Sequence, residues 1–221
     1  MSRTPRTLNV TECHQLLNTL LPEDTTQKKF RQGIRNYTIA LLMVEAGLRV
    51  GEVVQLLISD LWFNSAPVLS IIVRPEIAKT KSERIIPVST RLSDAIKQMH
   101  QSFWTPTTAV AEGFAFYRKN PASHVTTRQV ERFIRAAAMR SIGRPVHPHM
   151  LRHTFGTRIE RKAGIRVTQE LLGHEHVTST QIYTHPNEDD KRKAIDEVQA
   201  ELTGQEKDLE SSAGLSDAPD R

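Results

Sequence analysis

Apolar residues recur at helical spacing along most of the chain, and this pattern predicts a mainly helical fold. The intervals i, i+3, i+4 and i+7 place side chains on one face of a helix. They occur at Leu92, Ala95, Ile96 and Met99, and again at Val130, Phe133, Ile134 and Ala137. Further helices are expected over residues 34–46, 51–57, 148–162, 167–172, 178–183 and 187–202.

Three helix boundaries are marked by residue types that suit them. Asn9 followed by Glu12 is typical of a capping box, in which each side chain binds the backbone of the other. An apolar helical stripe then follows at Val10, Cys13, Leu16, Leu17 and Leu20. Gly47 can end the apolar helix over 34–46 with a positive φ. Pro148 suits the first turn of a helix, where a missing N–H costs nothing.

Two runs rich in β-branched residues predict a small sheet. Residues 67–73 (PVLSIIV) and 84–88 (RIIPV) are separated by a polar, basic loop. This arrangement is typical of an antiparallel hairpin. The predicted fold class is therefore mainly α with a small antiparallel β-sheet (α+β).

With 221 residues, the chain has the length of one domain with a short appendage. We expect the main domain over residues 1–186. A carboxy-terminal helix over 187–203 follows, with a narrow apolar stripe of Ile195, Val198 and Leu202. The tail over 204–221 is acidic and rich in Ser and Gly, so it is expected to be disordered.

Charge is unevenly distributed along the chain, whose formal net charge is +5. Residues 1–185 contain 25 Lys or Arg against 14 Asp or Glu, so their charge is +11. A basic body of this size suits a polyanion, with nucleic acid as the first candidate. No apolar run approaches the roughly 18 residues that span a bilayer, so no membrane partner is expected. Cys13 is the only cysteine, which excludes an intrachain disulfide and favours the reducing cytoplasm.

Four stretches concentrate the residues that could perform chemistry. They are GLRVGE (47–52), AKTKSERIIP (78–87), HPHMLRHT (147–154) and LLGHEHVTSTQIYTH (171–185). Together they supply arginines, lysines, histidines and a tyrosine, but no acidic pair for a divalent cation and no Gly-rich phosphate loop. This inventory favours phosphoryl transfer without a metal or other cofactor. In such a reaction fixed cations neutralise the phosphate charge and a side-chain oxygen attacks.

Two sets of residues in these stretches allow another interpretation. Arg49 and Glu52, one turn apart, could form a purely structural ion pair. The histidines have spacings that imitate a zinc site, at His149, His153, His174 and His176. However, the HExxH pattern is absent and no cysteine or well-placed carboxylate completes such a site, so no metal is expected.

From Asn9 to about Ala200 the chain resembles the phage integrase and Xer-type tyrosine recombinases. In that family an arginine follows a helix-ending Gly-Leu, and a lysine precedes a strand proline by eight residues. A His-x-x-Arg pair comes next, then a histidine after Leu-Leu-Gly, and the nucleophilic tyrosine nine residues later. The matching positions are Arg49, Lys79, His149, Arg152, His174 and Tyr183, in the family's order.

The resemblance implies a role for each of these residues. Tyr183 is the nucleophile, His149 accepts its proton and His174 donates a hydrogen bond to the phosphate. Arg49 and Arg152 clamp the phosphate, because the planar guanidinium suits two oxygens. Lysine can give up a proton, so Lys79, rather than Lys81, is the acid for the departing 5′ oxygen, by its spacing to Pro87. Glu52 is expected to orient Arg49.

The implied function is that of a site-specific recombinase acting on double-stranded DNA, as in DNA integration by mobile genetic elements. Attack produces a 3′-phosphotyrosine intermediate and a free 5′ hydroxyl, so the bond energy is kept and neither ATP nor metal is needed. Family members act as homotetramers through a Holliday junction. The helix over 187–203 resembles the segment that docks on a neighbouring protomer, and an accessory DNA-bending protein is a candidate partner.

Most members of the family also carry an amino-terminal core-binding domain, and this sequence begins where their catalytic domain begins. It is either part of a longer protein or a naturally short member of the family, like the fimbrial-switch invertases, which share the sequence HPHMLRH. Two other functions remain open here. One is a type IB topoisomerase, which relaxes DNA as a monomer, and the other is a non-catalytic DNA-binding regulator on the same fold.

Overall fold

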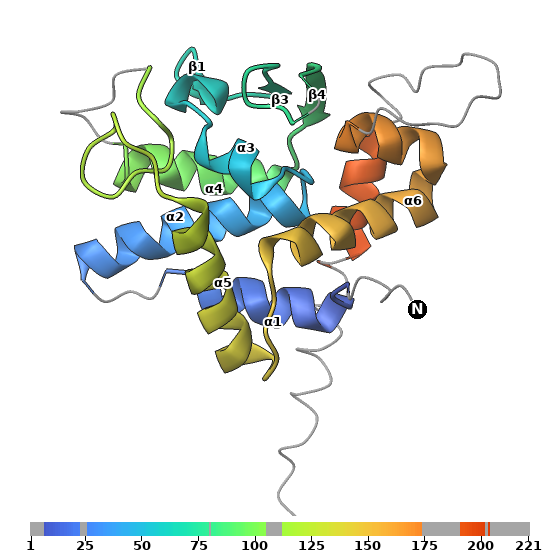
Figure 1. Cartoon of the computed structure of the whole chain (residues 1–221), viewed down its shortest axis with the longest axis horizontal. Coiled ribbons are helices and arrows are strands. Elements are labelled where there is room, and N and C mark those ends of the chain that lie inside the picture. The colour runs from blue at the N-terminus through green and yellow to red at the C-terminus, as the bar shows by residue number, and fades with distance from the viewer. Residues whose placement is uncertain are drawn as a thin grey trace, which may run out of the picture.

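The computed structural model describes residues 7–22, 26–79, 81–104, 112–173, 191–201 and 203 (Figure 1). The helices are α1 (Val10–Leu20), α2 (Gln27–Val44), α3 (Val50–Val54), α4 (Thr90–Ser102), α5 (Thr127–Ser141) and α6 (Pro148–Leu172), with a 3₁₀ turn η1 (Ile58–Asp60). The strands are β1 (Trp62–Phe63), β2 (Ala66–Pro67), β3 (Ser70–Val73) and β4 (Arg84–Pro87). The predicted class, mainly α with a small antiparallel component, is confirmed.

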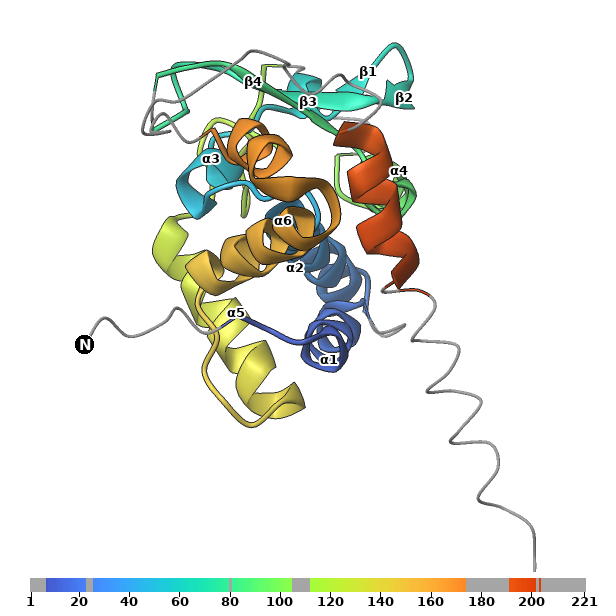
Figure 2. The ribbon, with the colours of Figure 1, turned by 90° about the vertical axis from the view of Figure 1, so that its right-hand side faces the viewer.

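Helix α2 forms the centre of the core, and all its side chains over residues 36–44 are buried. It contacts α1, α4, α5 and α6, and Figures 1 and 2 show it crossing the middle of the molecule between them. Its start differs from the prediction, because the helix begins at Gln27 rather than at residue 34. Thr26 caps it by accepting a hydrogen bond from the Lys29 backbone N–H. The first turns are mostly polar, so apolar periodicity could not reveal them.

The predicted capping box of α1 is present. The Asn9 side chain accepts from the Glu12 backbone N–H at 2.8 Å, and the Glu12 carboxylate accepts from that of Asn9 at 3.0 Å. Cys13 lies buried in the apolar stripe, and burial raises the pKa of its thiol to about 11. Such a thiol stays protonated near neutral pH, which agrees with a packing role.

The described residues contain two small sheets where the sequence predicted one. The run over 67–73 is divided, since Ala66–Pro67 pairs with Trp62–Phe63 and Ser70–Val73 pairs with Arg84–Pro87. Asn64 and Ser65 join β1 to β2 with φ values of 47° and 62°, the positive angles that a tight two-residue hairpin turn requires. Neither residue is glycine, so the usual mark of this turn is missing. The predicted hairpin is confirmed as β3 and β4.

Helix α6 begins at Pro148 as predicted and runs to Leu172 through a break at Gly164, whose φ is 82°. The short helix predicted over 167–172 is its final part. Residues 191–201 form a further helix, and its Ala194, Ile195 and Val198 join the same core. None of the described helices is long and apolar enough to cross a membrane. The segment over 178–183 and the tail over 204–221 lie outside the described residues.

Candidate active site

The chain reversal after α2 positions Arg49. Gly47 has a φ of +64°, and a Cβ at this residue would lie 2.3 Å from the Phe155 ring of α6, so the turn requires glycine for two reasons. Arg49 follows two residues later as the N-cap of α3. The predicted glycine turn is confirmed, and its close packing brings Arg49 to the side of α6.

The Arg49 guanidinium is held by Glu52, whose side chain is only 1% exposed. Nη1 of Arg49 donates to Oε1 of Glu52 at 3.0 Å, and the Arg49 backbone N–H donates to Oε2 at 2.7 Å. The Arg49 side chain itself remains 23% exposed. One edge of the guanidinium is therefore fixed while the rest can meet a ligand, as expected if Glu52 orients Arg49.

Arg152 is buried in α6, and two backbone carbonyls hold its guanidinium. Nη1 donates to the Gly47 carbonyl, and Nη2 donates to the Leu172 carbonyl at 2.6 Å. Gly47 belongs to the turn before Arg49, and Leu172 lies two residues before His174. A guanidinium has five N–H donors, so these two bonds leave three for an anion. Arg152 thus links the turn that precedes Arg49 to the segment that precedes His174.

His149 lies one turn before Arg152, at the amino-terminal end of α6, where the helix dipole favours an anion. Its ring packs edge-on against that of His153, with 4.7 Å between the centroids. Partial burial of the ring, and then the charges of His153, Arg152 and Arg49, lower the pKa of His149 below its usual value. Burial, and then the Arg49 charge, lower the pKa of Arg152 to about 9. The site therefore combines crowded cations, which an anion would stabilise, with a neutral imidazole that can accept a proton.

Residues 6–190 of the chain match the phage integrase family. The chain belongs to that family. It is 30% identical over 186 residues to tyrosine recombinase XerC of Pseudomonas fluorescens, covering 83% of this chain and 56% of that protein. It is 35% identical over 184 residues to tyrosine recombinase XerD of Lacticaseibacillus casei, covering 82% of this chain and 58% of that protein. The chain thus spans little more than half the length of these relatives.

The fold agrees with the assignment to the phage integrase family. The crystal structure of XerA recombinase matches with a TM-score of 0.64 at 29% identity, covering 87% of this chain and 65% of that one. The family match over residues 6–190 includes all six residues that the family pattern selects. The structure describes four of them, and Arg49, His149 and Arg152 lie close enough that the charges of both arginines lower the pKa of His149.

Lys79 is the fourth described residue, and the structure places it in the loop between β3 and β4. It is exposed, and its side chain forms no hydrogen bond or ion pair with another described residue. Lys81 has a different setting, because its φ is 57° and its Nζ donates to the Glu76 carbonyl in the same loop at 3.4 Å. The assignment of the acid to Lys79 stays a prediction.

His174 and Tyr183 lie outside the described residues, so their predicted roles are not tested by the geometry. Of the four histidines with zinc-like spacing, His176 also lies outside the described residues, and within the described ranges no group of three His, Cys, Asp or Glu side chains could hold a metal ion. The rings of His149 and His153 pack edge-on against each other.

The structure adds one residue that the sequence interpretation missed, Arg84 at the start of β4. Its guanidinium is buried and donates to both oxygens of Glu52, at 3.0 and 2.5 Å. Burial alone would raise the pKa of Glu52, but the hydrogen bonds and charge of Arg84, with the bonds from Arg49, outweigh it and hold that pKa below its usual range. Two guanidinium groups therefore share one buried carboxylate. The signal in the sequence that could have revealed Arg84 is a charged residue at the start of a predicted strand, at a position that faces the core.

Proposed function

We propose that this chain is the catalytic part of a site-specific tyrosine recombinase, which cuts and rejoins double-stranded DNA through a covalent bond to Tyr183. One observation carries the proposal. Arg49, Arg152 and His149 meet at the amino-terminal end of α6, with both arginines fixed by groups of the protein itself. The names of the relatives, tyrosine recombinases XerC and XerD, agree with this chemistry.

The proposed reaction is an in-line displacement at one DNA phosphate. The Tyr183 oxygen attacks phosphorus, its proton passes to His149, and the bond to the 5′ oxygen breaks as Lys79 supplies a proton. Arg49, Arg152 and His174 stabilise the charge on the non-bridging oxygens. The phosphotyrosine bond forms as the phosphodiester bond breaks, so the reverse reaction can join a different 5′ hydroxyl without ATP.

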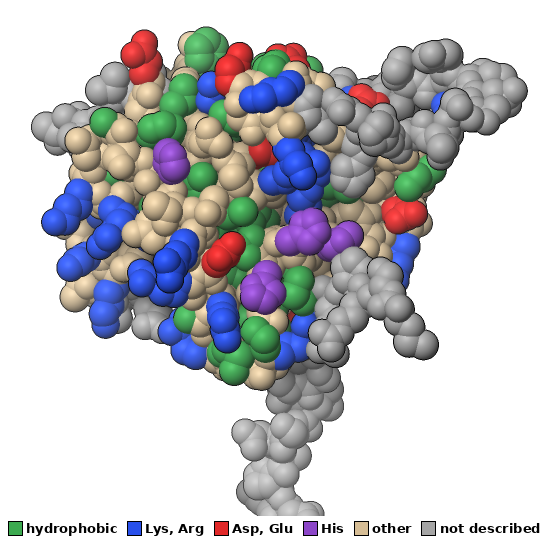
Figure 3. Space-filling view, viewed as in Figure 1, with side chains coloured by type: hydrophobic (Ala, Val, Ile, Leu, Met, Phe, Trp, Pro, Cys, Tyr) green, Lys and Arg blue, Asp and Glu red, His purple; other side chains and the backbone are tan. Residues whose placement is uncertain are grey.

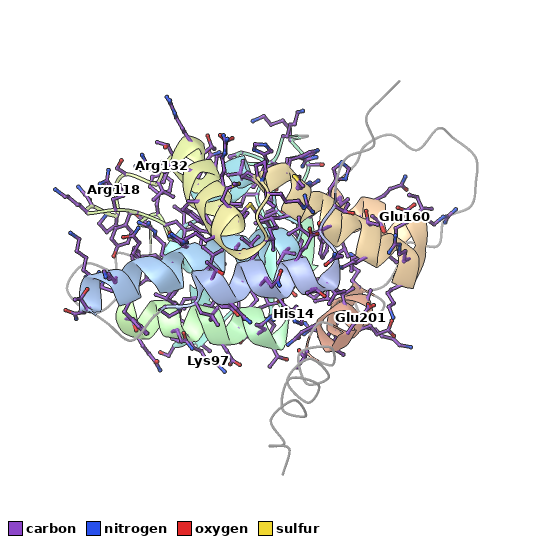
Figure 4. The ribbon with its side chains drawn as sticks, turned by 90° about the horizontal axis from the view of Figure 1, so that it is seen from below. His14, Lys97, Arg118, Arg132, Glu160 and Glu201 are labelled. Atoms are coloured by element: carbon purple, nitrogen blue, oxygen red, sulfur yellow. The ribbon has the colours of Figure 1, made fainter. Side chains whose placement is uncertain are left out.

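An exposed basic row supports DNA as the substrate. Arg128, Arg132 and Arg135 lie three and four residues apart on α5, opposite its buried Val130 and Ile134, and all three are exposed. Figure 4 shows Arg132 and Arg118 extending from the same side of the molecule. Figure 3, which views this side, shows Lys and Arg side chains gathered over α5 and histidines near the start of α6. Phosphates along a duplex could contact both groups at once.

We also propose that the active form is a tetramer located in the cytoplasm. The resemblance to the family implies that the helix over 187–203 docks on a neighbouring protomer, and its apolar stripe agrees with that expectation. In the single chain two residues of this stripe, Ile195 and Val198, are at most 3% exposed, as is the neighbouring Ala194, whereas Leu202 lies outside the described residues. Lys191 also pairs with Glu170, and Arg192 donates to the Leu69 carbonyl. Exchange between protomers therefore requires the helix to leave these contacts.

The test of the proposed function is trapping on a duplex nicked near the cleavage position, so that a short fragment is lost and rejoining is prevented. Wild-type protein in EDTA should form a denaturant-resistant protein–DNA adduct, and Tyr183→Phe should bind the duplex but form none. Because the target sequence must be found first, a pool of randomised duplexes would serve as substrate. Absence of any adduct would contradict the proposal, and relaxation of supercoiled DNA by dilute monomer would indicate a topoisomerase instead.

A further inference from the structure

The buried Arg84 belongs to no assigned part of the reaction, although it touches two segments that carry site residues. We infer that Arg84 is a positioning residue that sets the orientation of Arg49 through Glu52 and ties it to the segment leading to His174. This inference rests on the proposed function. It assigns Arg84 no contact with DNA.

The contacts of Arg84 join parts of the chain that are far apart in sequence. Nη1 and Nη2 bind the two oxygens of Glu52, and Nε donates to the Leu171 carbonyl at 3.1 Å. Leu171 stands in the last turn of α6, three residues before His174, and the neighbouring Leu172 carbonyl accepts from Arg152. One planar group thus connects α3, β4 and the end of α6.

Burial and packing fix this guanidinium in one geometry. The Arg84 side chain is 4% exposed and Glu52 is 1% exposed. A Cβ on Gly173 would lie 3.0 Å from Cδ of Arg84, so the turn before His174 closes directly over the arginine stem. A fork that binds both oxygens of a carboxylate also fixes the rotation of that carboxylate. Because Oε1 of Glu52 accepts from both Arg84 and Arg49, the position of Arg84 determines where Arg49 can lie.

Lysine cannot reproduce these contacts, because it offers one point charge in place of a rigid fork. Arg84→Lys keeps the charge next to Glu52 but loses the simultaneous bonds to two carboxylate oxygens and to Leu171. The chain offers a matched control in Arg144, which binds both oxygens of Glu12 and the Thr7 carbonyl. Arg144→Lys removes the same kind of fork from the contact between α1 and the loop before α6.

The experiment measures the single-turnover rate of adduct formation at saturating protein, together with DNA affinity and thermal unfolding, for wild type, Arg84→Lys and Arg144→Lys. Two nicked duplexes are compared, one with the normal scissile phosphodiester and one with a methylphosphonate. The methylphosphonate lacks one charged oxygen and so depends less on a well-placed guanidinium. Arg84→Lys should slow cleavage of the phosphodiester at least tenfold, with DNA affinity changed less than threefold. Its defect should shrink below threefold on the methylphosphonate, while Arg144→Lys should leave both rates unchanged.

An Arg84→Lys rate within threefold of wild type, or an equal defect on both substrates, would overturn the inference, since a merely structural role does not depend on phosphate charge. If Arg84→Lys does not fold, Arg84→Gln serves with the same criteria, because its amide can still donate to Glu52 or Leu171. A wild type that forms no adduct would overturn the proposed function and this inference with it. An adduct in wild type with no selective defect would overturn this inference alone.

Discussion

The two kinds of functional group in the candidate active site, the phosphate-binding arginines and the groups assigned to proton transfer, occupy contrasting environments. Arg152 and the partners of Arg49 are buried, with Arg152 at 4% exposure and Glu52 at 1%. Lys79 and His149, the groups assigned to proton transfer, are exposed, one in the loop between β3 and β4 and the other in the first turn of α6. The arginines are held by internal bonds, whereas Lys79 has no such support among the described residues.

This difference follows from what each group has to do. A guanidinium that stabilises developing charge is most effective when it is already in place and needs no reorganisation. A proton donor or acceptor must instead reach the reacting oxygen, and its hydrogen bond often tightens only when substrate binds. The contrast implies that substitution of a buried arginine removes a fixed part of the site, whereas substitution of an exposed group removes one chemical step.

Lys79→Ala gives the largest expected effect and tests the exposed class. The loss of a positioned acid should slow adduct formation by about 10²–10⁴. A duplex with sulfur at the 5′-bridging position needs no proton for departure, so it should restore most of the rate. Lys81→Ala is the matched control, and a defect with rescue in that variant would move the assignment to Lys81.

Arg152→Lys tests the buried class and should slow cleavage by roughly 10²–10³, the usual cost of removing one preorganised donor. Lysine cannot bind the Gly47 and Leu172 carbonyls together and still present donors to a phosphate. The 5′-bridging sulfur should give no rescue, because the missing function is not proton donation. Arg158→Lys is a control on the same helix, since Arg158 is buried toward Cys13 of α1. Full activity of Arg152→Lys would remove the distinction between the two classes.

The pH dependence of wild type gives the smallest effect and concerns His149. Its pKa lies below the usual 6.5, so more than half of the molecules keep a neutral imidazole at pH 6.5. The adduct rate at subsaturating DNA, which reports the free enzyme, should therefore fall to half only below pH 6.5. The unfolded chain takes up this proton first, so the free energy of unfolding should also decrease as pH falls below 6.5 toward the folded-state pKa. His124→Gln should not alter the profile, and a midpoint above pH 6.5 would contradict a neutral His149.

The sequence predicted those features of the fold and the site that are marked by neighbouring residues, and it missed those that depend on distant contacts. The Asn9–Glu12 capping box, the turn at Gly47 and the start of α6 at Pro148 each rest on one or two neighbouring residues, and all three are confirmed. The start of α2 at Gln27 was missed because its first turns lack an apolar face. Arg84 was missed because its partner Glu52 lies 32 residues away, and no periodicity records a pairing between elements.

The nucleophile itself is the central claim, and it can be identified directly. The trapped adduct would be digested with a protease and a nuclease, and the nucleotide-bearing peptide sequenced by mass spectrometry. The account predicts a nucleotide attached through its 3′ phosphate to Tyr183, in a peptide from residues 171–191. Attachment to any other residue, such as Tyr37 or Tyr117, or through a 5′ phosphate, would contradict the proposed reaction.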